Sequence, residues 1–141
     1  TYGPPMAVAP LNKVNQVALF ATTQIPPSKT SLGIPNYGYD WPLPWIEGTV
    51  ATSIGNQEAI NIARNNNATI RFDTVAQTPT FEYTSATGTP HVVWFEDARS
   101  IEAKLKLVNG YNLQGIGIWN LMRPFTQMWV VIRQYFDIKK I

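Results

Sequence analysis

Two short apolar runs set between amphipathic helical segments constrain the fold of this chain more than any other feature. They read Leu32-Gly-Ile-Pro-Asn-Tyr-Gly-Tyr-Asp-Trp41 and Gly115-Ile-Gly-Ile-Trp-Asn120. Strands that alternate with helices predict a parallel sheet, and the carboxyl ends of such strands carry the chemistry. Because both runs end in aromatic and polar side chains, they favour a ligand with flat apolar faces and a hydroxylated rim, as a sugar has.

Two parallel strands are predicted, at residues 30–37 and 114–119. Apolar residues at helical spacing predict helices over 11–23, 98–109 and 124–135 around them. A closed barrel takes about eight strands, so two can neither close one nor cover the edges of their own sheet. The pattern therefore predicts part of an α/β barrel whose remaining strands come from outside these residues.

The stretch between the two parallel strands has a different character. Its predicted elements are one helix and three strands, at 53–64, 69–73, 80–84 and 92–95. The run Ala86-Thr-Gly-Thr-Pro90 is a turn signal, so the last two strands are predicted to form a hairpin. We therefore expect a small α+β unit with antiparallel strands, inserted into the alternating pattern.

Composition narrows the class of function. Hydrophobic residues make up 45% of the chain and charged residues 14%, so part of the surface is expected to pack against other protein. The net charge of +2 is too weak to favour nucleic acid or an acidic membrane. The absence of cysteine excludes disulfides and thiolate zinc sites, and no cofactor or metal is expected. Without a start methionine or signal-like segment, the chain is expected to begin inside a longer parent.

Four runs of residues resemble one family. They are Tyr2-Gly-Pro-Pro-Met-Ala-Val-Ala-Pro10, Gly33-Ile-Pro-Asn-Tyr-Gly-Tyr-Asp-Trp41, Val93-Trp-Phe-Glu-Asp-Ala-Arg-Ser100 and Gly115-Ile-Gly-Ile-Trp119. In this order they resemble the chitinase-like family-18 glycoside hydrolases, above all the LysM-linked N-acetylglucosaminidases of spore-forming bacteria. The resemblance implies an α/β fold that is the C-terminal portion of a (β/α)8 TIM barrel, with two parallel strands and three helices. Residues 1–41 and 98–141 would be barrel segments, and 42–97 the chitinase-type α+β insertion.

The same resemblance implies an activity. The family hydrolyses β-1,4 bonds at N-acetylglucosamine, in peptidoglycan or chitin-like glycans, by substrate-assisted retaining catalysis, an exception to the rule of two catalytic carboxylates. Its Asp-x-x-Asp-x-Asp-x-Glu signature does not occur here, so no catalytic residue is expected and the chain alone should be inactive. This segment would supply the substrate-binding wall of a secreted, cell-wall or spore-associated enzyme. Its partners would be the glycan and the rest of the barrel, or a second copy joined through open sheet edges.

Five residues are predicted to bind the substrate: Trp119, Tyr37, Tyr39, Asp40 and Trp41. Trp119, at the end of the last barrel strand, would place its indole under the sugar whose bond is cut. Tyr37 and Tyr39 lie two residues apart and so point to one side of a strand. Asp40 either accepts hydrogen bonds from sugar hydroxyls or caps the following turn. Many related chitinases carry Arg in place of Tyr39.

Other candidate residues favour structural roles. His91, the single histidine, has no second ligand or nucleophile nearby in the sequence. Glu96 and Asp97 are adjacent and face opposite sides, so they cannot act on one bond, and Asp97 is placed to cap a helix. Arg99 is expected to tie the insertion to the barrel through one of these acids.

Two alternatives to an enzyme remain open at this point. One is a chitinase-like binding protein that has lost its catalytic acid; the residue that ends the parent's strand-four motif would distinguish it. The other is an independent α+β interaction domain unrelated to barrels, which predicts a compact monomer with covered sheet edges.

Overall fold

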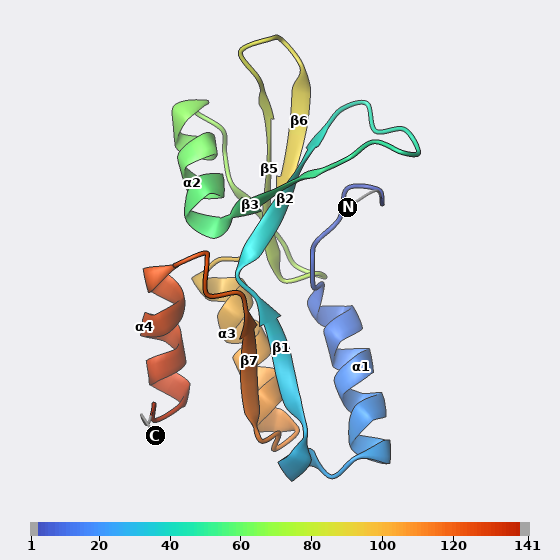
Figure 1. The fold of residues 1–141 in the computed structure, drawn as a ribbon, viewed down its shortest axis with the longest axis vertical. Helices are drawn as coiled ribbons and strands as arrows, with labels where there is room; N and C mark the ends of the chain where they lie inside the picture. The colour runs from blue at the N-terminus through green and yellow to red at the C-terminus, as the bar shows by residue number, and fades with distance from the viewer. Residues whose placement is uncertain (1–2, 139–141) are drawn as a thin grey trace.

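The computed structural model describes residues 3–138 and shows two sheets, one above the other (Figure 1). The helices and strands, in chain order, are α1 Leu11–Gln24, β1 Ser31–Pro35, β2 Tyr37–Pro42, β3 Thr52–Gly55, α2 Asn56–Asn65, β4 Arg71–Asp73, β5 Thr78–Thr84, β6 Pro90–Trp94, α3 Ala98–Gly110, β7 Gly115–Trp119 and α4 Thr126–Tyr135. A short 3-10 turn at Pro27–Lys29 leads into β1. Helices α1, α3 and α4 surround the lower sheet, and α2 lies beside the upper one (Figure 1).

The lower sheet consists of β1 and β7, which run parallel in the register Ser31↔Gly115 to Pro35↔Trp119. The predicted parallel pair is therefore present. Its core is one apolar cluster of buried side chains: Ile34, Ile101, Leu105, Phe125, Met128 and Ile132. Strand β1 ends at Pro35, two residues before the predicted end at residue 37, because Asn36 and the residues after it turn toward the upper sheet.

The upper sheet is antiparallel, with the strand order β3-β2-β6-β5-β4. Helix α2 covers one face through a second core cluster: Ile54, Ala59, Ala63, Phe81, Val93 and Phe95. The sheet begins at Tyr37, ahead of residue 42, where the sequence analysis starts the insertion. Gly38 makes this pairing possible, because a Cβ at residue 38 would overlap the Trp94 carbonyl oxygen.

The β5–β6 hairpin has the predicted turn at its tip. The Ser85 amide donates to the Thr89 carbonyl (2.8 Å), and the Gly88 amide donates to the Ser85 carbonyl (2.9 Å). Gly88 has a φ of +83°, a conformation that glycine adopts without steric cost. The turn therefore closes through its own hydrogen bonds.

Helix α3 begins at the junction between the sheets, as predicted. The Asp97 carboxylate accepts hydrogen bonds from the Arg99 and Ser100 amides and so caps the helix. The Arg99 guanidinium also binds Asp97 at 2.7 Å and lies 4.4 Å from the centroid of the Phe72 ring in β4. Arg99 thus contacts the upper sheet through Phe72, whereas its pair with Asp97 stays within the start of α3 and does not join the two parts.

A buried ion pair lies beside this cap. Glu96 and Lys104 are both fully buried, and Nζ of Lys104 donates to the two carboxylate oxygens at 3.0 and 2.8 Å. The Glu96 amide donates to Oδ1 of the buried Asn56, at the start of α2. Burial raises the pKa of the Glu96 carboxyl, and the Lys104 ammonium opposes that rise. The junction between the sheets is therefore polar inside and fully covered.

None of the helices in residues 3–138 is long and apolar enough to cross a membrane.

Candidate functional site

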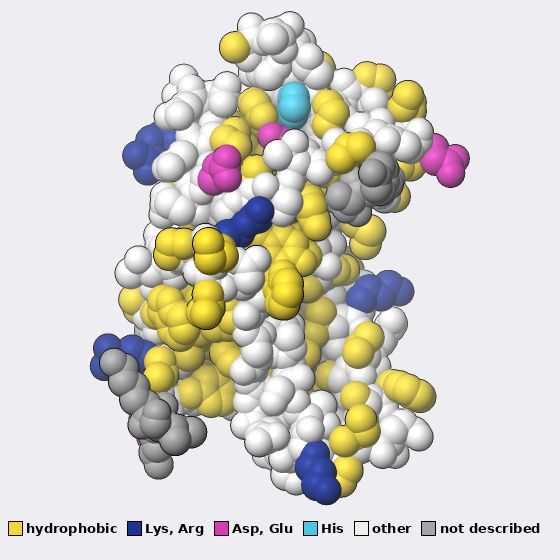
Figure 2. All heavy atoms as spheres, viewed as in Figure 1, with side chains coloured by type: hydrophobic (Ala, Val, Ile, Leu, Met, Phe, Trp, Pro, Cys, Tyr) yellow, Lys and Arg dark blue, Asp and Glu magenta, His cyan; other side chains and the backbone are white. Residues whose placement is uncertain are grey.

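Trp119 lies at the carboxyl end of β7 with 72% of its surface exposed. Leu121 and Met122, two and three residues further along the chain, are 88% and 86% exposed. Hydrophobic side chains gather over the middle of this face, at the level where β7 ends and α4 begins (Figure 2). Trp119 and Tyr37 together line a hollow of about 240 Å³. An exposed indole beside a tyrosine can pack on a flat apolar ligand face, while its N–H stays free to donate.

Tyr37, Tyr39 and Trp41 form a row of rings along one face of β2. The ring centroids lie 5.7 Å apart from Tyr37 to Tyr39 and 5.6 Å apart from Tyr39 to Trp41. All three line a second hollow of about 290 Å³. The two hollows adjoin each other, since Val8 and Tyr37 line both. Burial, and then the neighbouring Tyr39, raise the pKa of Tyr37 above its ordinary value, so its hydroxyl keeps its proton at neutral pH.

Trp41 differs from the two tyrosines in its exposure. Only 2% of it is accessible, and its indole N–H donates to the Gly3 carbonyl at 3.0 Å. It lies beneath the N-terminal segment, so it supports the row of rings and offers little surface of its own. The structure brings Trp119, Tyr37 and Tyr39 together as accessible side chains, and Trp41 only as their support.

Asp40 is separated from this group, since it faces the α2 side of the upper sheet. Its two carboxylate oxygens meet the Tyr83 hydroxyl at 2.6 Å and His91 Nδ1 at 2.8 Å, and the residue is 8% exposed. The prediction that Asp40 could accept from a ligand is not supported by this geometry, because both oxygens already have partners within the protein. Burial and the hydrogen bond to Asp40 raise the pKa of Tyr83. His91 has the structural surroundings expected of it.

Asn36 and Arg123 were not found by sequence reasoning, yet they hold the segment that carries Trp119. The Asn36 side chain binds the backbone of Asn120 and Arg123, and the Arg123 side chain binds Ser53 and Ile54 in β3. Arg123 lies outside the runs singled out in the sequence. Asn36 lies within one of them, but its side-chain partners are more than 80 residues away, so local pattern does not reveal its role.

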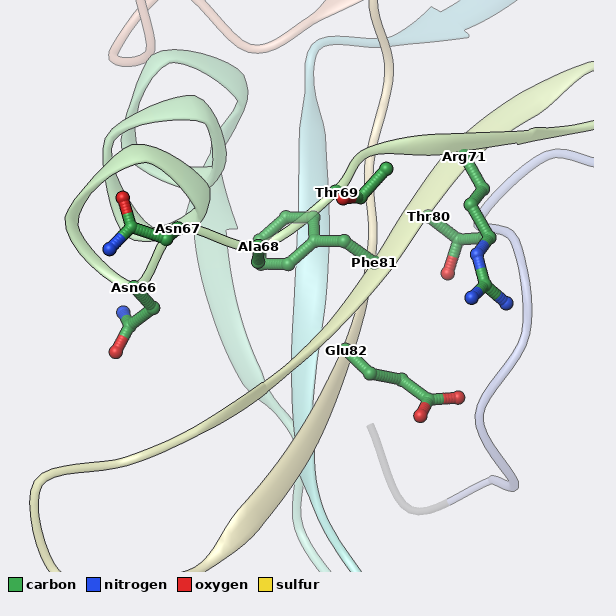
Figure 3. Close-up of a pocket in the computed structure, with 8 residues that line it drawn as sticks. All are labelled: Asn66, Asn67, Ala68, Thr69, Arg71, Thr80, Phe81 and Glu82. Atoms are coloured by element: carbon green, nitrogen blue, oxygen red, sulfur yellow. The ribbon is translucent and has the colours of Figure 1, made fainter.

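A larger cavity of about 370 Å³ opens at the end of α2, against β4 and β5 (Figure 3). Its lining is mostly polar: Asn66, Asn67, Ala68, Thr69, Arg71, Thr80, Phe81 and Glu82. Arg71 and Glu82 extend from neighbouring strands on the same side of the view (Figure 3). None of the five predicted residues lines it. Within residues 3–138 there is also no group of three His, Asp or Glu side chains arranged to hold a metal ion.

Comparison with known proteins gives consistent matches along the whole chain. The chain is 46% identical over 139 residues to the cortical fragment-lytic enzyme of Bacillus subtilis, which covers 98% of this chain and 32% of that protein. The crystal structure of the spore cortex-lytic enzyme SleL of Bacillus megaterium matches with a TM-score of 0.96 and 42% identity, over 100% of this chain and 33% of that one. A chitinase structure from Chromobacterium violaceum matches with a TM-score of 0.87 and 28% identity, over 98% of this chain and 42% of that one.

The chain thus spans about a third of the length of the curated relatives it matches most strongly. The model of glycosyl hydrolases family 18 matches residues 3–123. This match confirms the resemblance to the family-18 glycoside hydrolases that the four sequence runs predicted. The mixed α/β fold, the sequence identity and the family model agree: the chain belongs to glycosyl hydrolases family 18.

Proposed function

We propose that residues 1–141 are the C-terminal portion of the (β/α)8 barrel of a glycoside hydrolase and supply one wall and part of the floor of its glycan groove. The parallel β1–β7 pair supports this proposal, because no third strand of the described chain flanks either one. A sheet of two strands needs further neighbours to cover its edges. In the proposal the rest of the barrel covers them.

The observation that carries the proposal is the exposed Trp119 at the carboxyl end of β7. In barrels of this class the ligand binds at that end of the strands. The C–H face of a pyranose ring packs on the indole, and Tyr37 and Tyr39 bound the same groove with rings and hydroxyls. The ligand is accordingly a glycan, and family membership makes N-acetylglucosamine its recognised sugar.

The catalytic chemistry in this proposal begins on the substrate. The N-acetyl oxygen of the sugar attacks the anomeric carbon, and a glutamic acid outside these residues protonates the leaving oxygen. Trp119 positions the sugar ring for that attack. Because the 141 residues contain no Asp-x-x-Asp-x-Asp-x-Glu run, the purified chain is expected to release no product from peptidoglycan or chitin oligosaccharides.

The names of the relatives favour one glycan. One is a cortical fragment-lytic enzyme, and another is a putative sporulation-specific glycosylase. We therefore take peptidoglycan of the spore cortex as the substrate, and the spore or cell wall as the location, of the enzyme that contains this segment.

A chimaera tests the proposal. Residues 1–141 replace the matching third of the Bacillus subtilis relative, and muropeptides released from spore cortex are measured by mass spectrometry. We expect an active chimaera whose kcat/KM falls by about one to two orders of magnitude in Trp119→Ala, because an apolar transition-state contact is lost. Trp129→Ala, on the surface of α4, is the matched control and should keep full activity. An inactive chimaera, or full activity in Trp119→Ala, would contradict the proposal.

A further inference from the structure

Within the described residues, the turn that carries Trp119 is held by hydrogen bonds and has little apolar packing of its own. Trp119, Leu121 and Met122 all have more than two thirds of their surface in solvent. The next buried apolar side chain is Phe125, at the start of α4. Side chains that bury so little area contribute little free energy to fixing the backbone beneath them. Among the contacts that this chain itself makes, the polar ones therefore set the position of the indole.

Asn36 supplies the first set of these contacts. It is the single residue between β1 and β2, and it is 2% exposed. Its amide Nδ2 donates to the carbonyl oxygens of Asn120 (2.6 Å) and Arg123 (2.8 Å), and its Oδ1 accepts from the Asn120 amide at 2.7 Å. Its own backbone amide donates to the Trp119 carbonyl at 3.1 Å. One buried residue thus binds both ends of the turn.

Arg123 supplies the second set, and it reaches the upper sheet. Its Nη1 donates to the Ile54 carbonyl at 2.7 Å and to the Ser53 hydroxyl at 3.0 Å, and Nη2 donates to the Ser53 carbonyl at 3.2 Å. Ser53 pairs directly with Tyr39 across β3 and β2. The guanidinium also lies 5.8 Å from the centroid of the Tyr37 ring. A charged donor with three acceptors is a strong and directional tie.

We propose that Asn36 and Arg123 are positioning residues that fix the Trp119 indole relative to the Tyr37–Tyr39 wall, so that floor and wall of the groove keep one geometry. The inference rests on the proposed function, since it assigns a purpose to the placement of Trp119. Neither side chain needs to touch the glycan. Each acts by holding the Trp119 indole in place, because an indole displaced by about 1 Å would stabilise the transition state much less.

The first experiment needs no glycan and uses the chimaera, in which the rest of the barrel is present. Hydrogen exchange of the amides of residues 120–122 is compared among wild type, Asn36→Ala, Arg123→Ala and the exposed controls Asn109→Ala and Arg133→Ala. We expect exchange in this turn to rise roughly tenfold or more in the first two variants, because the closed turn loses its ties. The control variants should exchange like wild type. Unchanged exchange in both Asn36→Ala and Arg123→Ala would overturn the inference.

The second experiment measures kinetics in the chimaera. We expect kcat/KM to fall by about tenfold to a hundredfold in Arg123→Ala and Asn36→Ala. Arg123→Lys should recover part of the loss, because one ammonium can satisfy some of the three acceptors. If the two residues only stabilise the fold, Arg123→Ala and Asn36→Ala will lower the melting temperature but keep the same kcat/KM as Arg133→Ala. This result would overturn the inference.

The two proposals fail in different ways. If Trp119→Ala keeps full activity, the proposed function is wrong, whatever Arg123→Ala does. If Trp119→Ala is impaired while Asn36→Ala and Arg123→Ala match Arg133→Ala, the proposed function stands and the positioning role alone is wrong.

Discussion

At the scale of single residues, the Glu96–Lys104 pair is the contact most sensitive to change. Both groups are fully buried and hydrogen-bonded to each other. Glu96→Gln leaves the Lys104 ammonium buried without its counter-charge. We expect the free energy of unfolding in urea to fall by about 3–5 kcal/mol, the usual cost of breaking a buried pair from one side.

A double variant and a surface control complete this test. Glu96→Leu with Lys104→Met removes both charges and should recover most of the lost stability, because no uncompensated charge is left inside. Lys106→Gln removes one partner of an exposed pair on the same helix and should change stability far less. Equal losses in Glu96→Gln and Lys106→Gln would contradict the buried-pair argument.

Tyr83 gives a prediction on pH. Burial and the hydrogen bond to Asp40 raise its pKa in the folded chain above the ordinary tyrosine value of 10.0. The stability that this contact contributes is fully present below that ordinary value and is lost as pH rises toward the folded value. The stability advantage of wild type over Tyr83→Phe, measured by urea unfolding at a series of pH values, should therefore shrink above pH 10. A difference that is constant with pH would show that the Tyr83 pKa is the same folded and unfolded.

Single residues also mark the limit of what the sequence predicts. The placement of Trp119 at the end of a strand, and of Tyr37 and Tyr39 on one face of a strand, could be predicted because these are local properties. The surroundings of Asp40 could not, because its partners Tyr83 and His91 lie 43 and 51 residues away. The burial of Trp41 could not be predicted for the same reason, since the Gly3 carbonyl that accepts from its indole N–H lies 38 residues earlier.

At the scale of elements, the start of α3 depends on one side chain. Asp97 accepts from the Arg99 amide at 2.9 Å and from the Ser100 amide at 3.1 Å, and Ser100 Oγ accepts in return from the Asp97 amide. We expect Asp97→Ala to lower the free energy of unfolding by about 1–2 kcal/mol, because two helical N–H groups lose their acceptor.

The matched variant is Asp97→Asn, which keeps a capping oxygen and loses the charge that binds Arg99. Urea unfolding should place it between wild type and Asp97→Ala. If Asp97→Ala proves as stable as wild type, water satisfies these amides and the cap is unimportant to the helix.

The elements themselves were predictable to different degrees. Helices of ten residues or more with a periodic apolar face, such as α1 and α3, were found within a residue or two of their observed ends. Strand β3 was missed, and the helix prediction ran through part of it, because Thr52–Gly55 carries only one buried apolar side chain, Ile54. Pairing with β2, rather than local pattern, makes it a strand.

At the scale of the whole molecule, the β1–β7 pair has no further strand on either side within residues 3–138, and exposed apolar side chains lie beside it. Open edges and apolar patches promote pairing between copies. We expect light scattering to show self-association that grows with concentration, and Leu121→Lys with Met122→Lys to weaken it. A monomer of constant mass at high concentration would contradict the view that these surfaces normally lie against other protein.

The closed turn at the tip of the β5–β6 hairpin suggests a site for engineering. Its bonds run from residue 85 to residue 89 and do not depend on the remainder of the fold. Foreign peptides or a fluorophore spliced between Ser85 and Thr89 should therefore leave the rings on β2 undisturbed. The hairpin could then serve as a handle for redirecting an enzyme of this family toward new polymers, without redesign of its catalytic end.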